Sequence, residues 1–415
     1  MLPQHDVLMK NSSPLFSVKE TLTTLLQAAD GRTITDIEQL PTASVNQRIL
    51  AEDIVAPIHV PPEANAQMDG YAMNSSEISS QPLLISQRIT AGQVPEPLQQ
   101  GTAARIFTGA LLPAGADAVV MQEQCEVVET PNGPAVCLLH VPKSGEWVRN
   151  VGIDIHKDSI ILPAGTRLRA QELGLAASVG VATLPVKRRL KIAVFFTGDE
   201  LVMPGEHLLP GKIYNSNRFL INALLENLGC EIDDFGIVPD TLEATRIALR
   251  RAAQQNDVVI TSGGVSVGEE DHVKPAMQLE GQLHLWQIAI KPGKPLAFGQ
   301  IGNCFFVGLP GNPVSSFVTF LVLVRPFLLR LQGIKEVTPR FFLLRADFSW
   351  PKADVRNEFL RVKLNRDGGL DLYPNQNSAV LSSVVWGDGL VDNPAGNSIE
   401  LGDLVKFIPF SELLA

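Results

Sequence analysis

Three loops rich in glycine and other small residues follow apolar segments that are typical of buried strands. They span residues 197–201 (TGDEL), 261–268 (TSGGVSVG) and 308–316 (GLPGNPVSS). Small residues let backbone amides approach an oxyanion, and the N-terminus of a helix directs unpaired N–H groups toward it. Each loop alone is compatible with ordinary turn chemistry, so the inference depends on all three occurring together. Because ligands of α/β sheets bind at the carboxyl ends of the strands, we expect one anion-binding cleft.

Charged residues of both signs complement these loops. The motif 291–295 (KPGKP) holds two cations on a turn stiffened by prolines, which suits a phosphate or a small tetrahedral anion. Alone, this motif is equally compatible with a solvated basic loop. Carboxylates at predicted turns and element ends suit Mg²⁺ that bridges phosphate oxygens, although Asp69-Gly70 is also a common turn pair and Asp240 a typical helix cap. These carboxylates are Asp69, Glu200, Asp240 and Asp271.

Neither standard nucleotide-binding motif is present. Gly263, Gly264 and Gly268 do not have the spacing of a dinucleotide fingerprint, and residues 205–212 have neither the spacing of a P-loop nor a Ser or Thr after the lysine.

The elements that must position these groups alternate between strand and helix beyond residue 185. Near-continuous apolar strands separated by amphipathic helices favour a parallel or mostly parallel sheet covered on both faces. Asp240 with Glu243, and Asn312 with Pro313, predict two helix starts. We expect strands at 190–197, 231–238, 257–261 and 304–309, and helices at 218–228, 241–255 and 314–331.

The remaining chain predicts further domains. A short helix at 18–29 and another at 170–180 flank many short β-prone runs, and short strands return after residue 338. We therefore predict a multidomain α/β plus β fold. Its parts are a discontinuous N-terminal domain (15–55 and 160–186), a β-rich inserted domain (56–159), a three-layer α/β domain (187–337) and a small C-terminal β domain (338–415).

Composition excludes several classes of protein. The chain has 415 residues, 45% of them hydrophobic and 19% charged, which is typical of a globular protein of about three domains. Its formal net charge of −10 argues against a nucleic acid as the main partner. The four cysteines are scattered, so neither a disulfide framework nor a zinc site is expected. Residues 1–16 lack the apolar core of a signal peptide, and the apolar stretch 317–331 falls short of the roughly 20 residues that span a bilayer. We expect a cytoplasmic protein with no membrane partner.

Taken together, these residues resemble the molybdopterin molybdenumtransferase family, often called MoeA-like, to which the E domain of gephyrin also belongs. The resemblance covers about residues 16–410. It rests on short motifs in the expected order, at 68–72 (MDGYA), 107–109 (FTG), 149–154, 197–201, 261–271, 291–295 and 309–316.

The resemblance implies an enzyme that inserts molybdate into adenylylated molybdopterin. It would cleave the phosphoanhydride with the support of Mg²⁺ and release AMP with the finished molybdenum cofactor. Family members resemble elongated homodimers in which the α/β domain of one subunit and the β-rich domain of the other build each active site.

The resemblance also assigns residues. It implies catalytic roles for Asp69, Glu200 and Asp271, with Glu200 and Asp271 binding the metal. It implies molybdate binding by Lys291, Lys294, Arg361 and Ser378. The implied substrate-binding residues are Thr108, Arg149, Asp154, Asp240, Ser262, Gly263, Gly264, Ser266, Pro310, Gly311 and Asn312. Among these, Asp69, Thr108, Arg149 and Asp154 would face the site from the partner subunit.

The sequence departs from the family pattern at two places. Gly152-Ile153-Asp154 replaces the common Gly-Glu-Asp, and Gln376-Asn377-Ser378 replaces the expected Gln-Gly-Ser. Since Asn tolerates a left-handed backbone better than other non-glycine residues, we expect the second turn to be kept.

Two other functions remain as alternatives. A molybdopterin adenylyltransferase would resemble only the α/β domain, and the β-rich and C-terminal domains argue against it. A non-catalytic scaffold that keeps the fold for protein binding is disfavoured by the many charged positions that match the family. The sequence does not distinguish molybdate from tungstate.

Overall fold

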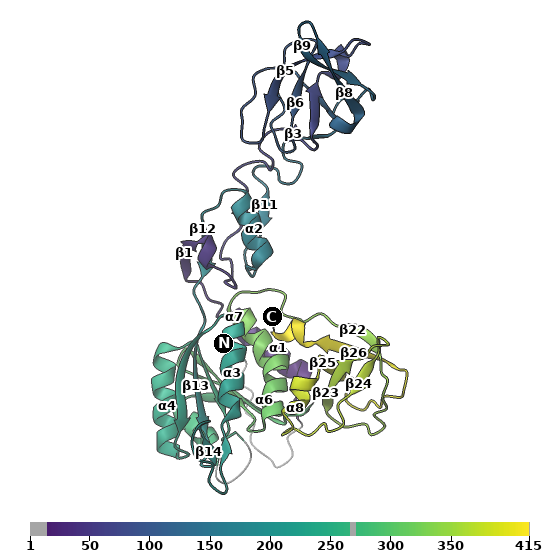
Figure 1. Cartoon of the computed structure of the whole chain (residues 1–415). Helices are drawn as coiled ribbons and strands as arrows, with labels where there is room; N and C mark the ends of the chain where they lie inside the picture. The colour runs from purple at the N-terminus through teal and green to yellow at the C-terminus, as the bar shows by residue number, and fades with distance from the viewer. Residues whose placement is uncertain (1–14, 266–270, 415) are drawn as a thin grey trace. The chain divides into compact units, whose positions relative to one another are not determined.

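The computed structural model describes residues 15–265 and 271–414, which divide into two compact units (Figure 1). The larger unit contains the chain up to Glu38, Gln47–Ile49 and the chain from Val186 onward. The smaller unit contains Gln39–Asn46 and Leu50–Pro185. This division is coarser than the four predicted domains, whose boundaries stay a prediction.

The larger unit is built on a six-stranded sheet with the order β16-β13-β17-β21-β20-β18. The first four strands are parallel to one another, and β20 runs antiparallel to both of its neighbours, β21 and β18. The predicted mostly parallel sheet is therefore confirmed. The strands are β16 (Glu231–Val238), β13 (Lys191–Thr197), β17 (Val258–Ser262), β21 (Cys304–Leu309), β20 (Pro295–Ile301) and β18 (Gln282–Gln287).

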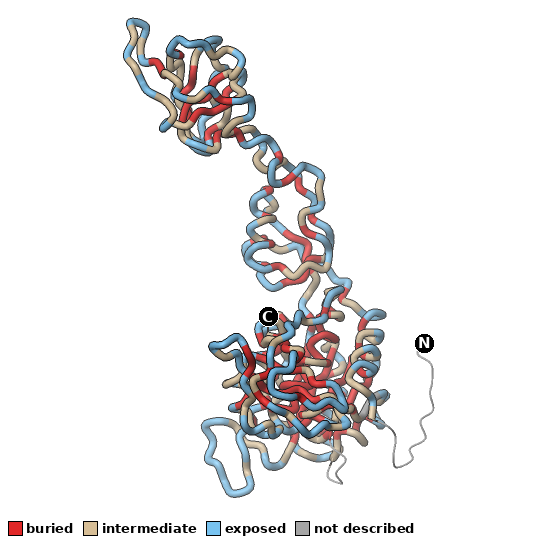
Figure 2. Tube along the Cα trace, turned by 90° about the vertical axis from the view of Figure 1, so that its right-hand side faces the viewer, coloured by how far each residue is buried: buried red, intermediate tan, exposed pale blue. Residues whose placement is uncertain are grey.

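Helices cover both faces of this sheet. Successive side chains of β13 point to opposite faces and pack in two different hydrophobic cores. Ile192, Val194 and Phe196 pack with one group of helices, whereas Ala193 and Phe195 pack with the other. The first group is α1 (Val18–Asp30), α3 (Ser216–Asn227), α6 (Pro313–Thr319) and α7 (Arg325–Leu331), and the second is α4 (Leu242–Gln255) and α5 (Val273–Glu280). Buried segments run through the middle of this unit (Figure 2), as expected for three layers.

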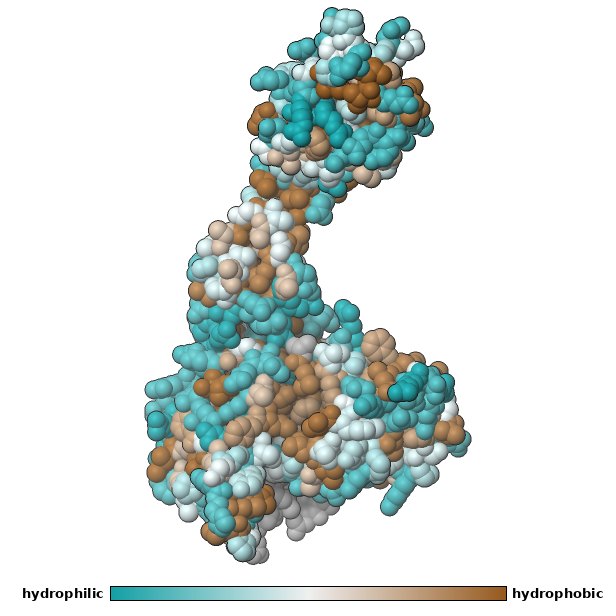
Figure 3. All heavy atoms as spheres, in the orientation of Figure 1, coloured by the Kyte–Doolittle hydropathy of each residue, from teal (hydrophilic) through white to brown (hydrophobic). Residues whose placement is uncertain are grey.

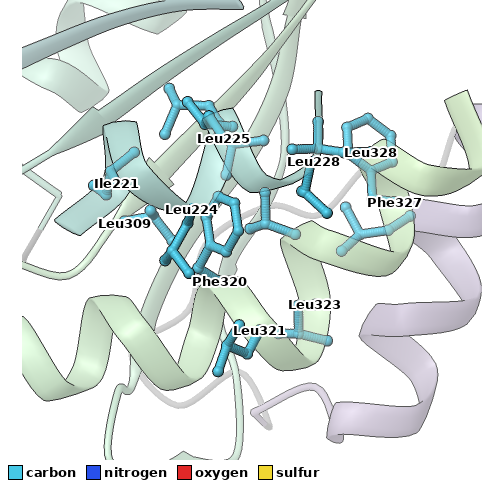
Figure 4. Packing of buried hydrophobic residues seen from close by; sticks show 14 of the residues in the cluster. Ile221, Leu224, Leu225, Leu228, Leu309, Phe320, Leu321, Leu323, Phe327 and Leu328 are labelled. Atoms are coloured by element: carbon cyan, nitrogen blue, oxygen red, sulfur yellow. The ribbon is translucent and has the colours of Figure 1, made fainter. Parts of the chain in front are cut away.

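The helical run Pro313–Leu331 of the larger unit is long and strongly apolar, with a mean hydropathy of 1.7. It joins α6 and α7 through a π-helical turn at Phe320–Val324. With 19 residues it is longer than predicted, and its length and composition alone would allow it to cross a membrane. However, 89% of it is buried inside the structure. Figure 4 shows Phe320 of this run beside Leu224 of α3 and Leu309 of β21, so packing in the core accounts for the apolarity of the run.

A second sheet follows toward the C-terminus and reaches back into the α/β part. Its order is β19-β23-β25-β26-β22, with β24 pairing β23. Strand β19 comes from the KPGKP segment and pairs in parallel with β23, which places Lys291 opposite Glu358. These strands are β19 (Ile290–Lys291), β23 (Asn357–Leu364), β25 (Gly389–Asn393), β26 (Leu404–Pro409), β22 (Phe342–Arg345) and β24 (Leu370–Leu372). The short helix α8 (Ser382–Trp386) lies between β24 and β25, and α9 (Phe410–Leu414) follows β26.

The smaller unit contains the predicted β-rich segment, whose main sheet has the order β7-β4-β6-β5-β9-β8. Its strands are β7 (Ala118–Met121), β4 (Gly70–Met73), β6 (Thr102–Ile106), β5 (Leu83–Ile89), β9 (Gly133–Leu138) and β8 (Cys125–Thr130). The unit also holds α2 (Ala170–Ser178) and two-stranded pairs. These pairs are β3 (Asn65–Ala66) with β10 (Val148–Arg149), and β2 (Ile54–Val55) with β11 (Ile160–Leu162), while β1 (Ile37–Pro41) with β12 (Thr183–Lys187) continues into the larger unit.

The residue that caps helix α4 differs from the predicted one. Helix α4 is capped by Thr241, whose hydroxyl accepts the Ala244 N–H, and Asp240 is not its cap. The hydroxyl is one residue nearer the first turn, so it takes the capping position and leaves the Asp240 carboxylate for another contact. The run from Pro313 begins after Asn312 as predicted, but the Asn312 side chain makes no capping hydrogen bond.

Glu280 of α5 provides a pH-dependent contact with α4. Its carboxylate accepts hydrogen bonds from Arg250 Nη2 and Arg246 Nε, each at 2.7 Å. Hydrogen bonds from Arg250 and then Arg246 lower the pKa of Glu280 from 4.5 to about 2. Because the pKa is lower in the folded state, the contact stabilises the protein above pH 4.5 and loses its effect as the pH falls toward 2.

We therefore expect Glu280→Gln to lower the thermal unfolding midpoint at neutral pH. The difference from the unsubstituted protein should shrink as the pH is lowered below 4.5. Thermal scans of both proteins across this range measure the effect. A difference that is the same at every pH would contradict the assigned contact.

Candidate active site

A cavity of about 900 Å³ lies in the larger unit at the carboxyl ends of β13, β17 and β21. All three predicted loops line it, together with the KPGKP segment. The loops meet because the three parallel strands end at the same edge of the sheet. Residues 376–379 also line it and include the predicted Ser378, whereas sequence reasoning missed Arg356 and residues 213–217 of the lining.

Hydrogen bonds hold the loops together at the edge of the sheet. Ser262 Oγ donates to the Pro310 carbonyl at 2.9 Å and accepts from Asn217 Nδ2 at 2.8 Å. Asn217 Nδ2 also donates to the Gly311 carbonyl at 2.7 Å. Gly263 has φ +96°, and a Cβ there would lie 2.4 Å from the Thr197 carbonyl oxygen, so only glycine allows this approach. Asn217 was not predicted, and its only sequence signal is its place in the first turn of α3, two residues after the capping Asn215.

The two lysines of the KPGKP motif have different surroundings. Lys291 Nζ donates to Glu358 at 2.8 Å and to Asp354 at 3.1 Å. Burial opposes its charge, but the hydrogen bonds with Glu358 and Asp354 outweigh burial and raise the pKa of Lys291. Lys294 is exposed at the cavity and forms no ion pair with any described residue. Lys294 is therefore the lysine whose charge is available to an anion.

Arg356 supplies a second cation to the cavity lining. Asp354 accepts its Nε at 3.0 Å and its Nη2 at 2.9 Å, which fixes the plane of the guanidinium. The remaining Nη1 group forms no hydrogen bond within the described part of the chain. A fixed guanidinium with free donors is well suited to bind an oxyanion.

Arg361 does not line the cavity, contrary to its expected role as a ligand. Only 1% of it is exposed, and its guanidinium donates to Ser383 Oγ at 3.1 Å and to the Asn377 carbonyl at 3.4 Å. Burial lowers the pKa of Arg361 to about 10. Its backbone N–H also donates to Gln376 Oε1 at 2.9 Å. Arg361 thus supports residues 376–379 from behind.

Ser378 lines the cavity as expected, but its turn differs from the prediction. Asn377 does not have the expected left-handed backbone. Instead its Oδ1 accepts the Ala379 N–H at 2.9 Å, so the side chain closes the turn that glycine would form by backbone geometry alone. The Ser378 carbonyl accepts the Val314 N–H at 3.0 Å and thereby caps the helical run from Pro313.

Three predicted acids follow the carboxyl ends of strands in the α/β sheet. Glu200 is exposed and lines the cavity. Asp240 accepts the Thr197 hydroxyl at 2.9 Å, and Asp271 lies beside Gly264, where a Cβ would be 3.4 Å from Asp271 Oδ1. Gly263, Pro310, Gly311 and Asn312 line the cavity, whereas Asp240, Asp271 and Gly264 do not. Ser266 is outside the described residues.

These acids fit a metal ion only in part. Within residues 15–265 and 271–414, no group of three or more His, Cys, Asp or Glu side chains is placed to hold a metal. Mg²⁺ commonly takes one or two carboxylates from the protein and completes its shell with substrate phosphates and water. Of the two predicted metal ligands, Glu200 lines the cavity and Asp271 does not, so the donor set suits an ion held largely by a substrate phosphate better than a permanently held ion.

The other predicted residues belong to the smaller unit. Asp69 Oδ1 accepts the Thr108 N–H at 2.8 Å and the Thr108 hydroxyl at 2.7 Å. These hydrogen bonds, the backbone one first, lower the pKa of Asp69 and keep it ionised. Arg149 and Asp154 are both exposed. The structure therefore joins Asp69 and Thr108 and leaves Arg149 and Asp154 open to solvent within this unit.

Comparisons with known proteins identify the family. Three family models match the chain: "MoeA N-terminal region (domain I and II)" at residues 16–180, "Probable molybdopterin binding domain" at 193–330 and "MoeA C-terminal region (domain IV)" at 344–410. A molybdopterin molybdenumtransferase from Haemophilus influenzae is 40% identical over 389 residues, which cover 92% of this chain and 95% of that protein. The chain belongs to the molybdopterin molybdenumtransferase family.

Other relatives agree with this assignment. A molybdopterin molybdenumtransferase from a Nostoc species is 34% identical, over 95% of this chain and 88% of its own. The crystal structure of a molybdopterin biosynthesis MoeA protein from Pyrococcus horikoshii has a TM-score of 0.77 and 33% identity, and covers 96% of this chain and 99% of its own. This molybdenumtransferase is therefore an enzyme of molybdenum cofactor biosynthesis that inserts molybdenum into molybdopterin, and the predicted family, fold class and activity are confirmed.

Proposed function

We propose that this molybdenumtransferase takes molybdate and adenylylated molybdopterin as substrates and releases AMP with the molybdenum cofactor. The observation that carries the proposal is the cavity itself, where Lys294 and Arg356 stand with Glu200 around about 900 Å³. That volume is within the usual range for a cofactor-sized ligand. Cations and a carboxylate in one cavity suit a dianion beside a metal-bound phosphate.

Each group has a distinct role in this proposal. The ammonium of Lys294, the Nη1 group of Arg356 and the hydroxyl of Ser378 donate hydrogen bonds to molybdate. Arg361 holds residues 376–379, and Asn217 holds the loop that contains Gly311. The start of the helical run at Pro313 and the loop at Ser262 and Gly263 provide the anion-favouring backbone for the phosphates.

Mg²⁺ would be held by Glu200 and Asp271 together with phosphate oxygens of the substrate. When bound, the ion would offset negative charge on the phosphoanhydride. We expect Glu200→Gln to raise the Mg²⁺ concentration for half-maximal AMP release by about tenfold, because a neutral amide is a weaker ligand than a carboxylate. Glu226→Gln is the matched control, since Glu226 is exposed on α3 and does not line the cavity. An unchanged Mg²⁺ requirement in Glu200→Gln would remove Glu200 from the metal site.

AMP release tests the proposal directly. Purified protein is incubated with adenylylated molybdopterin and Mg²⁺, with and without molybdate, and AMP is quantified. The proposal predicts AMP release that depends on molybdate. Pyrophosphate release from molybdopterin and Mg-ATP without molybdate would favour an adenylyltransferase, and no product in either assay would favour a scaffold.

We also propose a cytoplasmic homodimer in which Asp69, Thr108, Arg149 and Asp154 act at the cavity of the partner subunit. Hydrophobic residues gather over the helices of the larger unit near α1 and α6 (Figure 3), as expected for a surface that meets a second copy. Mixing Asp69→Asn with Lys294→Met subunits tests shared sites. If sites are shared, mixed dimers contain one intact site, so random reassociation should restore about a quarter of the original activity. No recovery would contradict shared sites.

A further inference from the structure

Two arginines of the smaller unit lie directly opposite one another on neighbouring strands. Arg88 of β5 and Arg105 of β6 are partners in the parallel register. The Cζ atom of each lies 4.6 Å from the centroid of the same Phe107 ring, so the two charges are separated by at most twice that distance. Like charges placed directly opposite one another destabilise a sheet. The pair therefore needs an explanation other than the stability of the sheet.

No carboxylate neutralises this pair by contact in the described chain. Arg105 donates to the Gly70 carbonyl at 3.0 Å and to Gln122 Oε1 at 2.6 Å, both of which are neutral. Asp69 and Glu123 influence Arg105 electrostatically, but neither forms an ion pair with it. Arg88 is exposed and forms neither a hydrogen bond nor an ion pair with a described residue. Both guanidiniums therefore have N–H donors that are available to bind a ligand.

Phe107 holds the two cations in place. Attraction between a guanidinium and an aromatic ring restrains each side chain without neutralising its charge. Arg105 also lies 5.1 Å from the Tyr71 ring, its cross-strand partner on β4. The arrangement therefore reduces the entropy that two long side chains would lose on binding an anion.

We propose that Arg88 and Arg105 form a phosphate-binding site, and that it binds the phosphate of a nucleoside monophosphate. Planar guanidiniums match phosphate oxygens and can each donate two hydrogen bonds to them. The site adjoins Thr108, which follows Phe107 and holds Asp69. That the phosphate belongs to a nucleotide rests on the proposed release of AMP. That the site recognises phosphate rests only on the two arginines and their contacts.

Arginine modification with phenylglyoxal, read by peptide mass spectrometry on the full chain, tests this site residue by residue. We expect AMP to slow modification of Arg88 and Arg105 at least about fivefold, since a bound phosphate would occupy the guanidinium donors that the reagent attacks. Arg251 is the internal control, because its guanidinium lies 5.3 Å from the Phe235 ring in the larger unit and forms no ion pair with a described residue. Its modification rate should not change.

Further ligands and variants separate the possible outcomes. Protection by AMP that exceeds protection by inorganic phosphate supports a nucleotide, and equal protection supports phosphate recognition from a free ion. Protection by adenosine alone, or by none of these ligands, overturns the proposal. Arg88→Gln should remove most of the protection at Arg105, and it leaves the hydrogen bonds of Arg105 to Gly70 and Gln122 in place. No turnover is needed, so Lys294→Met should show the same protection even if the proposed reaction fails.

Discussion

Replacing Lys294 with methionine should raise the molybdate concentration for half-maximal AMP release by about 10- to 100-fold, because a hydrogen bond from a charged donor contributes about 1.5–3 kcal/mol. Lys294 is exposed at the cavity and has no ion-pair partner among the described residues, so nothing else compensates its charge. Methionine keeps most of the length of the side chain and removes only the ammonium. The measurement is a molybdate titration of AMP release at saturating pterin substrate.

The controls for Lys294→Met separate the anion from the pterin. Binding of adenylylated molybdopterin in the absence of molybdate should change little. Lys335→Met should leave the titration unchanged, since Lys335 is exposed and does not line the cavity. Arg356→Gln should act in the same direction as Lys294→Met. If Lys294→Met weakens pterin binding and not the molybdate dependence, Lys294 contacts the pterin substrate instead.

Replacing Lys291 with methionine should have its main effect on stability. Lys291 is the ion-pair partner of Glu358, which is only 1% exposed, and it also contacts Asp354. Removing one member of a buried pair leaves the other charge uncompensated, at a cost of about 3–5 kcal/mol when both are fully buried. Because 38% of the Lys291 side chain is exposed, we expect a smaller loss, of about 2 kcal/mol. Denaturant-induced unfolding of the larger unit measures this loss.

A double variant distinguishes stability from anion binding. Lys291→Met combined with Glu358→Gln removes both charges, and Gln can still accept the Trp350 indole N–H that now donates to Glu358 at 2.8 Å. We expect the double variant to regain most of the stability lost in the single one. A single variant that unfolds like the original protein but needs much more molybdate would show that Lys291 contacts the anion.

Local chemistry along the chain predicted the cavity well. The loops after β13, β17 and β21 could be predicted because parallel strands bring their carboxyl ends to one edge, and small residues occur in all three loops together. Contacts between segments that are distant in the sequence could not be predicted from it. Nothing near Lys291 in the sequence indicates that β19 pairs with β23, and that pairing supplies Glu358 as a counter-charge.

The arginines of the C-terminal sheet show the same limit. Arg356 and Arg361 are both near the predicted molybdate site in sequence, and the hydrophobic pattern does not say which one reaches the cavity. Residues 358–362 are all buried in β23, so Arg361 lies inside the sheet. Arg356 precedes the strand, where the chain is free to turn its side chain toward the cavity. Burial follows from tertiary packing, which one sequence does not contain.

The pairing of β19 with β23 links the α/β segment to the C-terminal sheet, and it limits how the enzyme can be cut into fragments. A fragment limited to residues 187–337 would contain every glycine-rich loop of the cavity. It would nevertheless lack the Ser378 carbonyl that satisfies the Val314 N–H, and both counterions of Lys291. The KPGKP turn would then lie at a bare sheet edge, with its ammonium in water. Binding of the oxyanion therefore depends on both the α/β segment and the C-terminal sheet. An engineered protein that exchanges one of these segments must also keep the residues of the other that contact it.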